Sequence, residues 1–101
     1  MSRSEFRYNK KRKHYAYLFK DVGNHRKNIL ITTKPIRLFH KKSKNNIRLY
    51  KNPNKNNVKA VYLIPIIYVD CINSFDSKIL KWTFDKNDKR KVKRIKRHKK
   101  S

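Results

Sequence analysis

Hydrophobic and polar residues alternate through the first third of the chain in a pattern typical of β-strands. Within residues 14–20, three aromatic residues fall at every second position, which is the spacing of a single sheet face. Residues 28–33 form a second apolar stretch, and Gly23, the only glycine of the chain, lies between the two. Because a lone glycine in such a place often supplies a turn with positive φ, we expect a β-hairpin here.

The longest apolar run, residues 58–69, is rich in valine, isoleucine and tyrosine, which favours a strand over a helix. Pro65 cannot donate a hydrogen bond to a neighbouring strand, so we expect this strand to bend sharply there. The run has about half the roughly 20 residues that a membrane-spanning helix needs. Residues 47–50 and 77–84 alternate as well and are predicted to be further strands.

The C-terminal region has the signals of a helix. Asp85 is a candidate N-cap, and Asp88 lies three residues further on, where a carboxylate favours the positive end of the helix dipole. Val92 and Ile95 are the only apolar residues that follow, three positions apart. They form a narrow seam that is expected to dock on the sheet.

Together these elements predict an α+β fold. We expect a small bent antiparallel sheet or partly open SH3-like barrel, because the connections are too short for parallel crossovers. A single domain would span residues 14–97, with its sheet in 14–84 and a basic helix in 86–97. A flexible basic arm, 1–13, would precede it and a basic tail, 98–101, would follow.

The charge balance of the chain indicates what kind of partner it binds. Thirty lysines and arginines face six acids, giving a formal net charge of +24. Self-repulsion at this density is relieved by a polyanion, and nucleic acid is the first candidate, with RNA favoured over DNA. A ribonucleoprotein or an acidic protein is an alternative partner, and anionic lipid surfaces also attract basic segments. We expect no membrane insertion and a cytoplasmic location, since Cys71 is the one cysteine and the N-terminus lacks an apolar signal-peptide core.

Basic residues of the N-terminal arm, the 34–51 segment and the helix are the predicted phosphate contacts, and tyrosines among or beside them are predicted to stack on unpaired bases. The alternatives are a solvated basic tail and aromatic rings that belong to the core. The predicted nucleic-acid-binding residues are Arg12, Lys13, Arg37, Lys41, Lys42, Lys44, Arg48, Lys89, Arg90, Lys93, Arg94, Lys96 and Arg97, and the predicted stacking residues are Tyr15, Tyr17 and Tyr50.

No metal or cofactor is expected. The four histidines have no metal-ligand spacing with Cys71 or with an acid, and a chain with one glycine has no phosphate-cradling glycine loop. Nothing in the sequence pairs a cysteine, histidine and acid for nucleophilic catalysis.

Residues 12–19, followed by residues 27–33, resemble the first hairpin of the MazF/PemK toxins, small SH3-like barrels that cleave RNA without a metal. The resemblance implies a metal-independent endoribonuclease in which Arg12 or Lys13 is the phosphate-stabilising cation and Thr32 or Thr33 its partner. The family's proline after the basic residue is His14 in this chain. The glycine that follows the family's threonine is also absent.

The chain also resembles small uncharacterised basic proteins of mobile elements in low-GC Gram-positive bacteria. The shared features are the pairs His14-Tyr15 and Ile31-Thr32, the Asn-Pro-Asn loop at residues 52–54, and the ending at residues 82–89. This resemblance implies no activity. Three functions therefore remain open from the sequence: a nucleic-acid-binding protein, a metal-independent endoribonuclease, and a structural component of a ribonucleoprotein.

Overall fold

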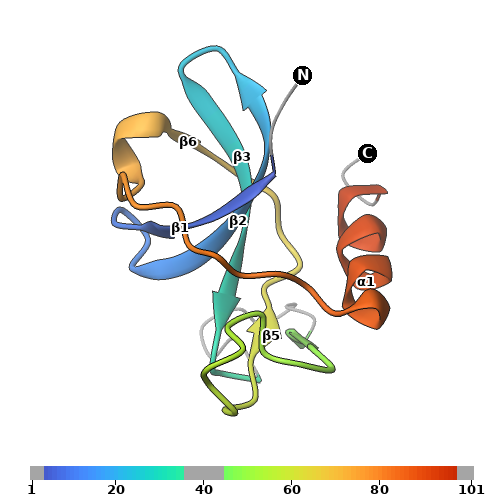
Figure 1. Cartoon of the computed structure of the whole chain (residues 1–101). Coiled ribbons are helices and arrows are strands. Elements are labelled where there is room, and N and C mark those ends of the chain that lie inside the picture. The colour runs from blue at the N-terminus through green and yellow to red at the C-terminus, as the bar shows by residue number, and fades with distance from the viewer. Residues whose placement is uncertain (1–3, 36–44, 98–101) are drawn as a thin grey trace.

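A computed structural model of the chain describes residues 4–35 and 45–97 (Figure 1). It has an antiparallel sheet that does not close into a barrel, a short 3₁₀ helix and one C-terminal helix, which confirms the predicted α+β fold. The strand order is β1-β2-β3-β5-β4, and β6 pairs with the same strand β3 that β5 pairs with. The elements are β1 (Glu5–Asn9), β2 (His14–Val22), β3 (His25–Thr32), β4 (Ile47–Arg48), β5 (Tyr62–Leu63), β6 (Tyr68–Cys71), η1 (Ile72–Ser74) and α1 (Lys86–Arg97).

The central hairpin of β2 and β3 confirms the expectation drawn from the alternating pattern. Gly23 lies in its turn with a φ of 59°, the left-handed conformation that favours glycine. The prediction of a flexible N-terminal arm, in contrast, is wrong for residues 5–9, because these residues form β1 and pair with β2. Phe6 explains the difference, since it is 4% exposed and belongs to the core.

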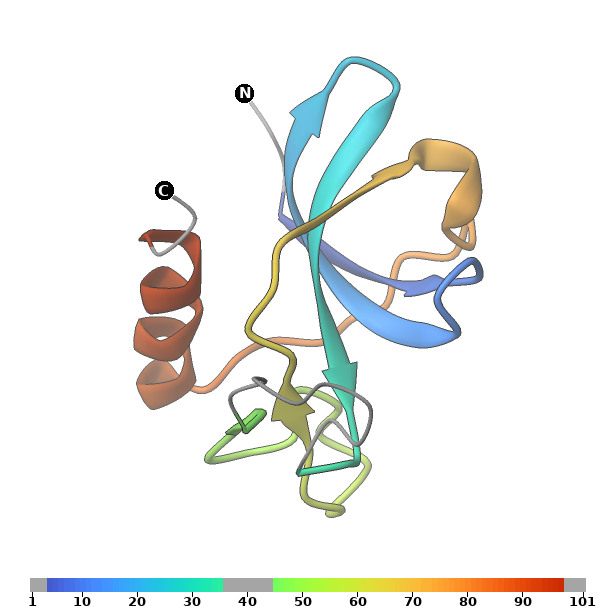
Figure 2. The same cartoon turned by 180° about the vertical axis from the view of Figure 1, so that it is seen from behind.

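The apolar run 58–69 forms two short strands rather than one. β5 pairs with Ile31 and Thr32, whereas β6 pairs with the start of β3. Pro65 lies between the two strands, as the predicted bend required, and the backbone N–H of Ile64 still donates to Leu30 at 3.0 Å. The run therefore follows β3 along its length, antiparallel to it in both strands, and bends between them (Figure 2).

Residues 77–84 follow the free edge of β1 without forming the strand that was predicted there. An isolated bridge joins Leu80 to Phe6, and the Leu80 N–H donates to the Phe6 carbonyl at 2.9 Å. A second bridge joins Asn9 to Phe75. Leu80, Trp82 and Phe84 do share one face, because all three pack in or against the larger core cluster. The segment therefore covers part of the β1 edge and leaves the rest of that edge without a neighbouring strand among the described residues.

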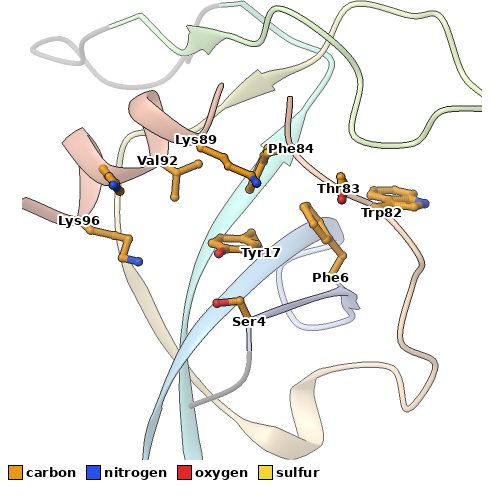
Figure 3. A pocket seen from close by; sticks show the side chains of 10 residues that line it. Ser4, Phe6, Tyr17, Trp82, Thr83, Phe84, Lys89, Val92 and Lys96 are labelled. Carbon is orange, nitrogen blue, oxygen red and sulfur yellow. The ribbon is translucent and has the colours of Figure 1, made fainter. Parts of the chain in front are cut away.

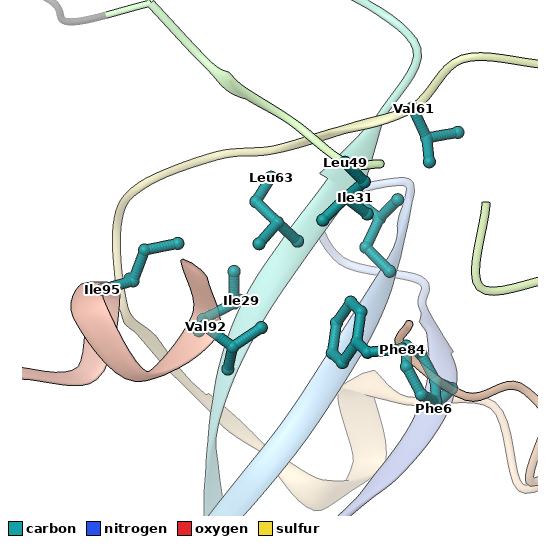
Figure 4. Close-up of a cluster of buried hydrophobic side chains, with 9 residues drawn as sticks. All are labelled: Phe6, Ile29, Ile31, Leu49, Val61, Leu63, Phe84, Val92 and Ile95. Atoms are coloured by element: carbon teal, nitrogen blue, oxygen red, sulfur yellow. The ribbon is translucent and has the colours of Figure 1, made fainter. Parts of the chain in front are cut away.

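The core lies on both faces of the central hairpin. One cluster fills the space between the sheet and α1, where Val92 and Ile95 are 4% and 6% exposed, so the predicted helix seam is confirmed (Figure 4). A smaller cluster lies on the other face, around Leu18 and Leu30. No helix in the described ranges is long and apolar enough to cross a membrane.

Candidate nucleic-acid interface

Six aromatic rings form a continuous row on the sheet face that α1 packs against. In order they are Tyr8, Tyr15, Trp82, Phe6, Tyr17 and Phe19, and the centroids of neighbouring rings are 4.8 to 6.2 Å apart. We call this row the aromatic strip. The strand period produces it, because the β1 and β2 rings alternate with residues that point to the opposite face.

An open groove of about 310 Å³ separates part of the aromatic strip from α1 (Figure 3). Aromatic rings of Phe6, Tyr17 and Trp82 line its sheet side. Lysines of α1 line the opposite side: Lys89, Lys93 and Lys96. The groove thus combines flat apolar rings with a row of cations, and the sequence-predicted residues Tyr17, Lys89, Lys93 and Lys96 all meet in it.

The three groove lysines share one face of α1 because they are spaced by four and three residues. The arginines at the next positions have the same spacing and lie on a face turned by about 100°. These arginines are exposed and line none of the grooves described here: Arg90, Arg94 and Arg97. The helix therefore presents two equal sets of cations, only one of which faces the aromatic strip.

Two acids at its N-terminus fix α1 in place. Asp85 caps the helix, since its Oδ2 accepts the Asn87 N–H at 2.9 Å. Asp88 is fully buried and accepts the backbone N–H groups of Tyr50 and Lys51 at 2.7 and 3.1 Å. Lys91 completes the connection, with its Nζ 3.1 Å from Asp88. The lysine face is thereby held at a defined position relative to the loop after β4.

A second, smaller pocket of about 170 Å³ adjoins the aromatic strip on the other side of Trp82. Tyr15 and Trp82 form its aromatic wall, and the end of β3 contributes Thr32 and Thr33. Its remaining polar lining is a set of three amides: Asn52, Asn54 and Asn57. We call it the asparagine pocket. Trp82 lines both this pocket and the groove, so the two sites are neighbours that meet at this residue.

The remaining predicted contacts lie elsewhere. Tyr50 is 66% exposed, but it belongs to no ring pair of the strip and lies beside Lys51. Arg48 is exposed and lines a separate hollow of the 48–61 loop. Four predicted phosphate contacts, Arg37, Lys41, Lys42 and Lys44, lie outside the described residues.

Arg12 has a structural role. Its guanidinium donates two hydrogen bonds to Asp70, at 2.8 and 2.7 Å, and lies 3.9 Å above the centroid of the Tyr68 ring. Asn9 and Asn28 donate to the same carboxylate at 3.0 and 3.2 Å. Burial opposes ionisation of Asp70, but these hydrogen bonds and the Arg12 charge outweigh it and lower its pKa to about 2. The hydrogen bond to Asp70 in turn raises the pKa of Arg12.

Of the residues that the MazF/PemK resemblance selects, Arg12 and Thr32 are not brought together. The Arg12 guanidinium is at Asp70, beside Asn28, and Thr32 lies four residues further along β3, about 13 Å by the rise of a strand. The Thr32 hydroxyl accepts the backbone N–H of Lys34. Lys13 has a φ of 59° in the β1–β2 turn. Within residues 4–35 and 45–97, no three His, Cys, Asp or Glu residues lie close enough to hold a metal ion.

Sequence reasoning missed the central position of Trp82 and the whole asparagine pocket. The alternation of residues 77–84 correctly predicts that Trp82 shares a face with Leu80 and Phe84. Periodicity does not predict that this segment brings Trp82 into contact with Tyr15 of the strip. The asparagines were assigned to a turn-rich loop, which they do form through Asx turns. Only the packing of that loop against Tyr15 gives them a binding surface.

No family model, curated protein or solved structure matches this chain. The groove, the aromatic strip and the asparagine pocket are the features of the described residues that bear on function.

Proposed function

We propose that this protein binds single-stranded nucleic acid along the aromatic strip, with RNA as the expected natural ligand. The observation that carries the proposal is the groove of about 310 Å³. Tyr17 and Trp82 line one side of it, and Lys89, Lys93 and Lys96 of α1 line the other. Aromatic side chains stack on bases of any sequence, and lysines neutralise phosphates. A strand lying in the groove would have its bases on the sheet side and its backbone on the helix side.

Unpaired bases are required because the rings of the strip are packed against one another and only partly exposed. Tyr15 is 44% exposed, and Tyr17 and Trp82 are half-buried. A paired base inside a duplex cannot reach such a surface, whereas a splayed base of a single strand can. RNA is favoured because its loops and ends offer unpaired bases, which are the usual targets of sequence-reading RNA-binding proteins.

The charge of the chain supports the same proposal. The acids of the described residues are largely engaged inside the protein, as in the ion pairs of Glu5 with Arg7, Asp70 with Arg12 and Asp88 with Lys91. These pairs leave the lysines of the groove without a competing carboxylate among the groove-lining residues. The endoribonuclease alternative has no comparable support, since Arg12 is engaged by Asp70 and is distant from Thr32.

The test is binding of a fluorescently labelled 12-nucleotide single-stranded RNA, followed by anisotropy, with unlabelled competitors. We expect unlabelled single strands to compete and a duplex of equal length to compete far more weakly. The logarithm of the affinity should fall linearly with the logarithm of the salt concentration. Equal competition by duplex would contradict the stacking surface, and an affinity independent of salt would contradict the lysine contacts.

The protein should first be purified with and without nuclease, because a chain with net charge +24 retains polyanions from the cell. Incubation of the same RNA with the protein and a chelator tests the endoribonuclease alternative in parallel. Intact RNA after prolonged incubation, together with tight binding, is the result expected from the proposal.

A further inference from the structure

The asparagine pocket has the features of a site for one base rather than for a length of strand. Its volume of about 170 Å³ is roughly half that of the groove, and it shares the Trp82 ring with the groove. A base in it would stack beside Tyr15, the most exposed ring of the strip at 44%. Its polar lining distinguishes it from the groove, where the polar side chains are mainly lysines.

The orientation of the pocket amides is fixed by the loop itself. The Oδ1 atom of Asn54 accepts the backbone N–H of Asn56 at 3.1 Å, and the Oδ1 atom of Asn57 accepts the backbone N–H of Lys59 at 2.9 Å. A backbone N–H can only donate, so the oxygen of each amide must face it. The two Nδ2 groups consequently point away from these backbone donors.

These Nδ2 groups are unused donors. Among the described residues, neither the Nδ2 of Asn54 nor that of Asn57 has a hydrogen-bond partner, whereas the Nδ2 of Asn52 donates to the Lys59 carbonyl at 3.1 Å. Both asparagines line the pocket beside its aromatic wall, so their Nδ2 groups are available to donate to a base bound there. Such a site accepts a base edge that carries hydrogen-bond acceptors.

We infer that the asparagine pocket selects one unpaired uracil or thymine of the bound strand, through donation from Asn54 and Asn57 to its carbonyl oxygens. This inference builds on the proposed function and adds sequence preference at one position. Uracil and thymine carry two ring carbonyls, whereas adenine carries none and presents an amino donor instead. Each of the two adenine edges that carry the amino donor offers only one ring-nitrogen acceptor, so one of the two amide donors would be left without a partner.

The test compares the affinities of 12-nucleotide oligouridine and oligoadenosine for the wild type and for single variants. Asn54→Asp and Asn57→Asp each keep an oxygen for the Asx turn and replace the donor by an acceptor. Asn56→Asp is the matched control, because it adds the same charge to the same loop but does not line the pocket. The readout is the change of the uridine-to-adenosine affinity ratio from wild type to variant. The stacking of free oligoadenosine is the same for both proteins and cancels in this comparison, and the added charge affects both oligonucleotides alike.

We expect the uridine-to-adenosine affinity ratio to fall by about three- to tenfold in Asn54→Asp and in Asn57→Asp, and to stay at the wild-type value in Asn56→Asp. An unchanged ratio in both pocket variants, with wild-type stability in urea, would overturn the inference while leaving strand binding intact. If one of the two variants is destabilised, the other provides the same comparison at the second amide. Failure of the wild type to bind either oligonucleotide would instead overturn the proposed function.

Discussion

The Asp88 carboxylate lies 2.7 Å from the backbone nitrogen of Tyr50 and accepts its hydrogen bond, which joins the first turn of α1 to the loop after β4. A second backbone donor, Lys51, binds the other oxygen of the same carboxylate at 3.1 Å. The buried Asp88 side chain thus attaches the helix that carries the groove lysines to the loop that carries the pocket asparagines.

Replacement of Asp88 by alanine is expected to lower the free energy of unfolding by about 3 kcal/mol. The change leaves two backbone N–H groups without their charged acceptor, and each such bond contributes on the order of 1.5 kcal/mol or more. Urea denaturation measures the effect. Asp85→Ala is the control, because it removes the helix cap and only an exposed ion pair with Lys51, and it should cost about 1 kcal/mol. Equal losses in the two variants would contradict the special role of Asp88.

Asp70 should make stability depend on pH in the acid range. Its pKa in the folded protein is about 2, below the ordinary value of 3.8 that it regains on unfolding. Because the folded value is the lower one, the contribution is present above about pH 4 and is lost as the pH falls toward 2. The shift corresponds to about 2 kcal/mol.

The measurement compares urea unfolding of the wild type and Asp70→Asn at pH 5, 3 and 2. The other carboxylates titrate in both proteins, so the difference between them isolates Asp70. We expect the wild type to be the more stable protein at pH 5 and the difference to shrink by about 2 kcal/mol toward pH 2. A difference that is constant over this range would contradict the ionised, Arg12-bound state of Asp70.

The two cation faces of α1 allow a test with matched charge. Replacement of the three groove lysines, Lys89, Lys93 and Lys96, by glutamine should weaken binding of single-stranded RNA. It should also reduce the magnitude of the salt slope by about 2, because each lost phosphate contact on a single strand removes about 0.7. Replacement of Arg90, Arg94 and Arg97 by glutamine removes the same charge from the same helix and should reduce the slope less. Identical slopes in the two triple variants would indicate that the groove has no preferred role.

Tyr15→Ala should reduce the affinity for single-stranded RNA by about tenfold, because stacking on one aromatic ring contributes about 1–3 kcal/mol per base. Tyr50→Ala is the natural comparison. Tyr50 is the more exposed ring, at 66% against 44%, but it has no neighbouring ring in the strip. We expect a smaller loss for Tyr50, and a larger one would place the stacking surface on the 48–61 loop instead.

The features that the sequence predicts correctly are those that depend on residues close together in the chain. Alternation along residues 14–20 and the Gly23 turn are local, and they predicted the hairpin correctly. The caps and the Val92 seam predicted a helix whose bounds agree with Lys86–Arg97. Phe6 shows the limit, because one ring among basic neighbours looked too isolated to order a strand, and only the packing of Tyr17, Trp82 and Phe84 around it does so.

The candidate site was predictable in part for the same reason. The sequence identifies Tyr17 and the helix lysines as candidate contacts from their residue types. Whether they line the same groove depends on how α1 packs on the sheet, which no local pattern specifies. Arg12 is the opposite case. The sequence offered it as a phosphate contact, and its engagement depends on Asp70, 58 positions away in the chain. A partner at that separation is found only in the folded structure.

The position of Trp82 gives the protein a built-in optical reporter. It is the only tryptophan of the chain, and its ring borders both the groove and the asparagine pocket. A base that stacks at either site would change the surroundings of this one indole, so intrinsic emission can follow the arrival of an unlabelled strand without any change to the protein. Because Tyr15 lines the pocket but not the groove and Tyr17 lines the groove but not the pocket, variants of these two residues would separate the two events in the same signal.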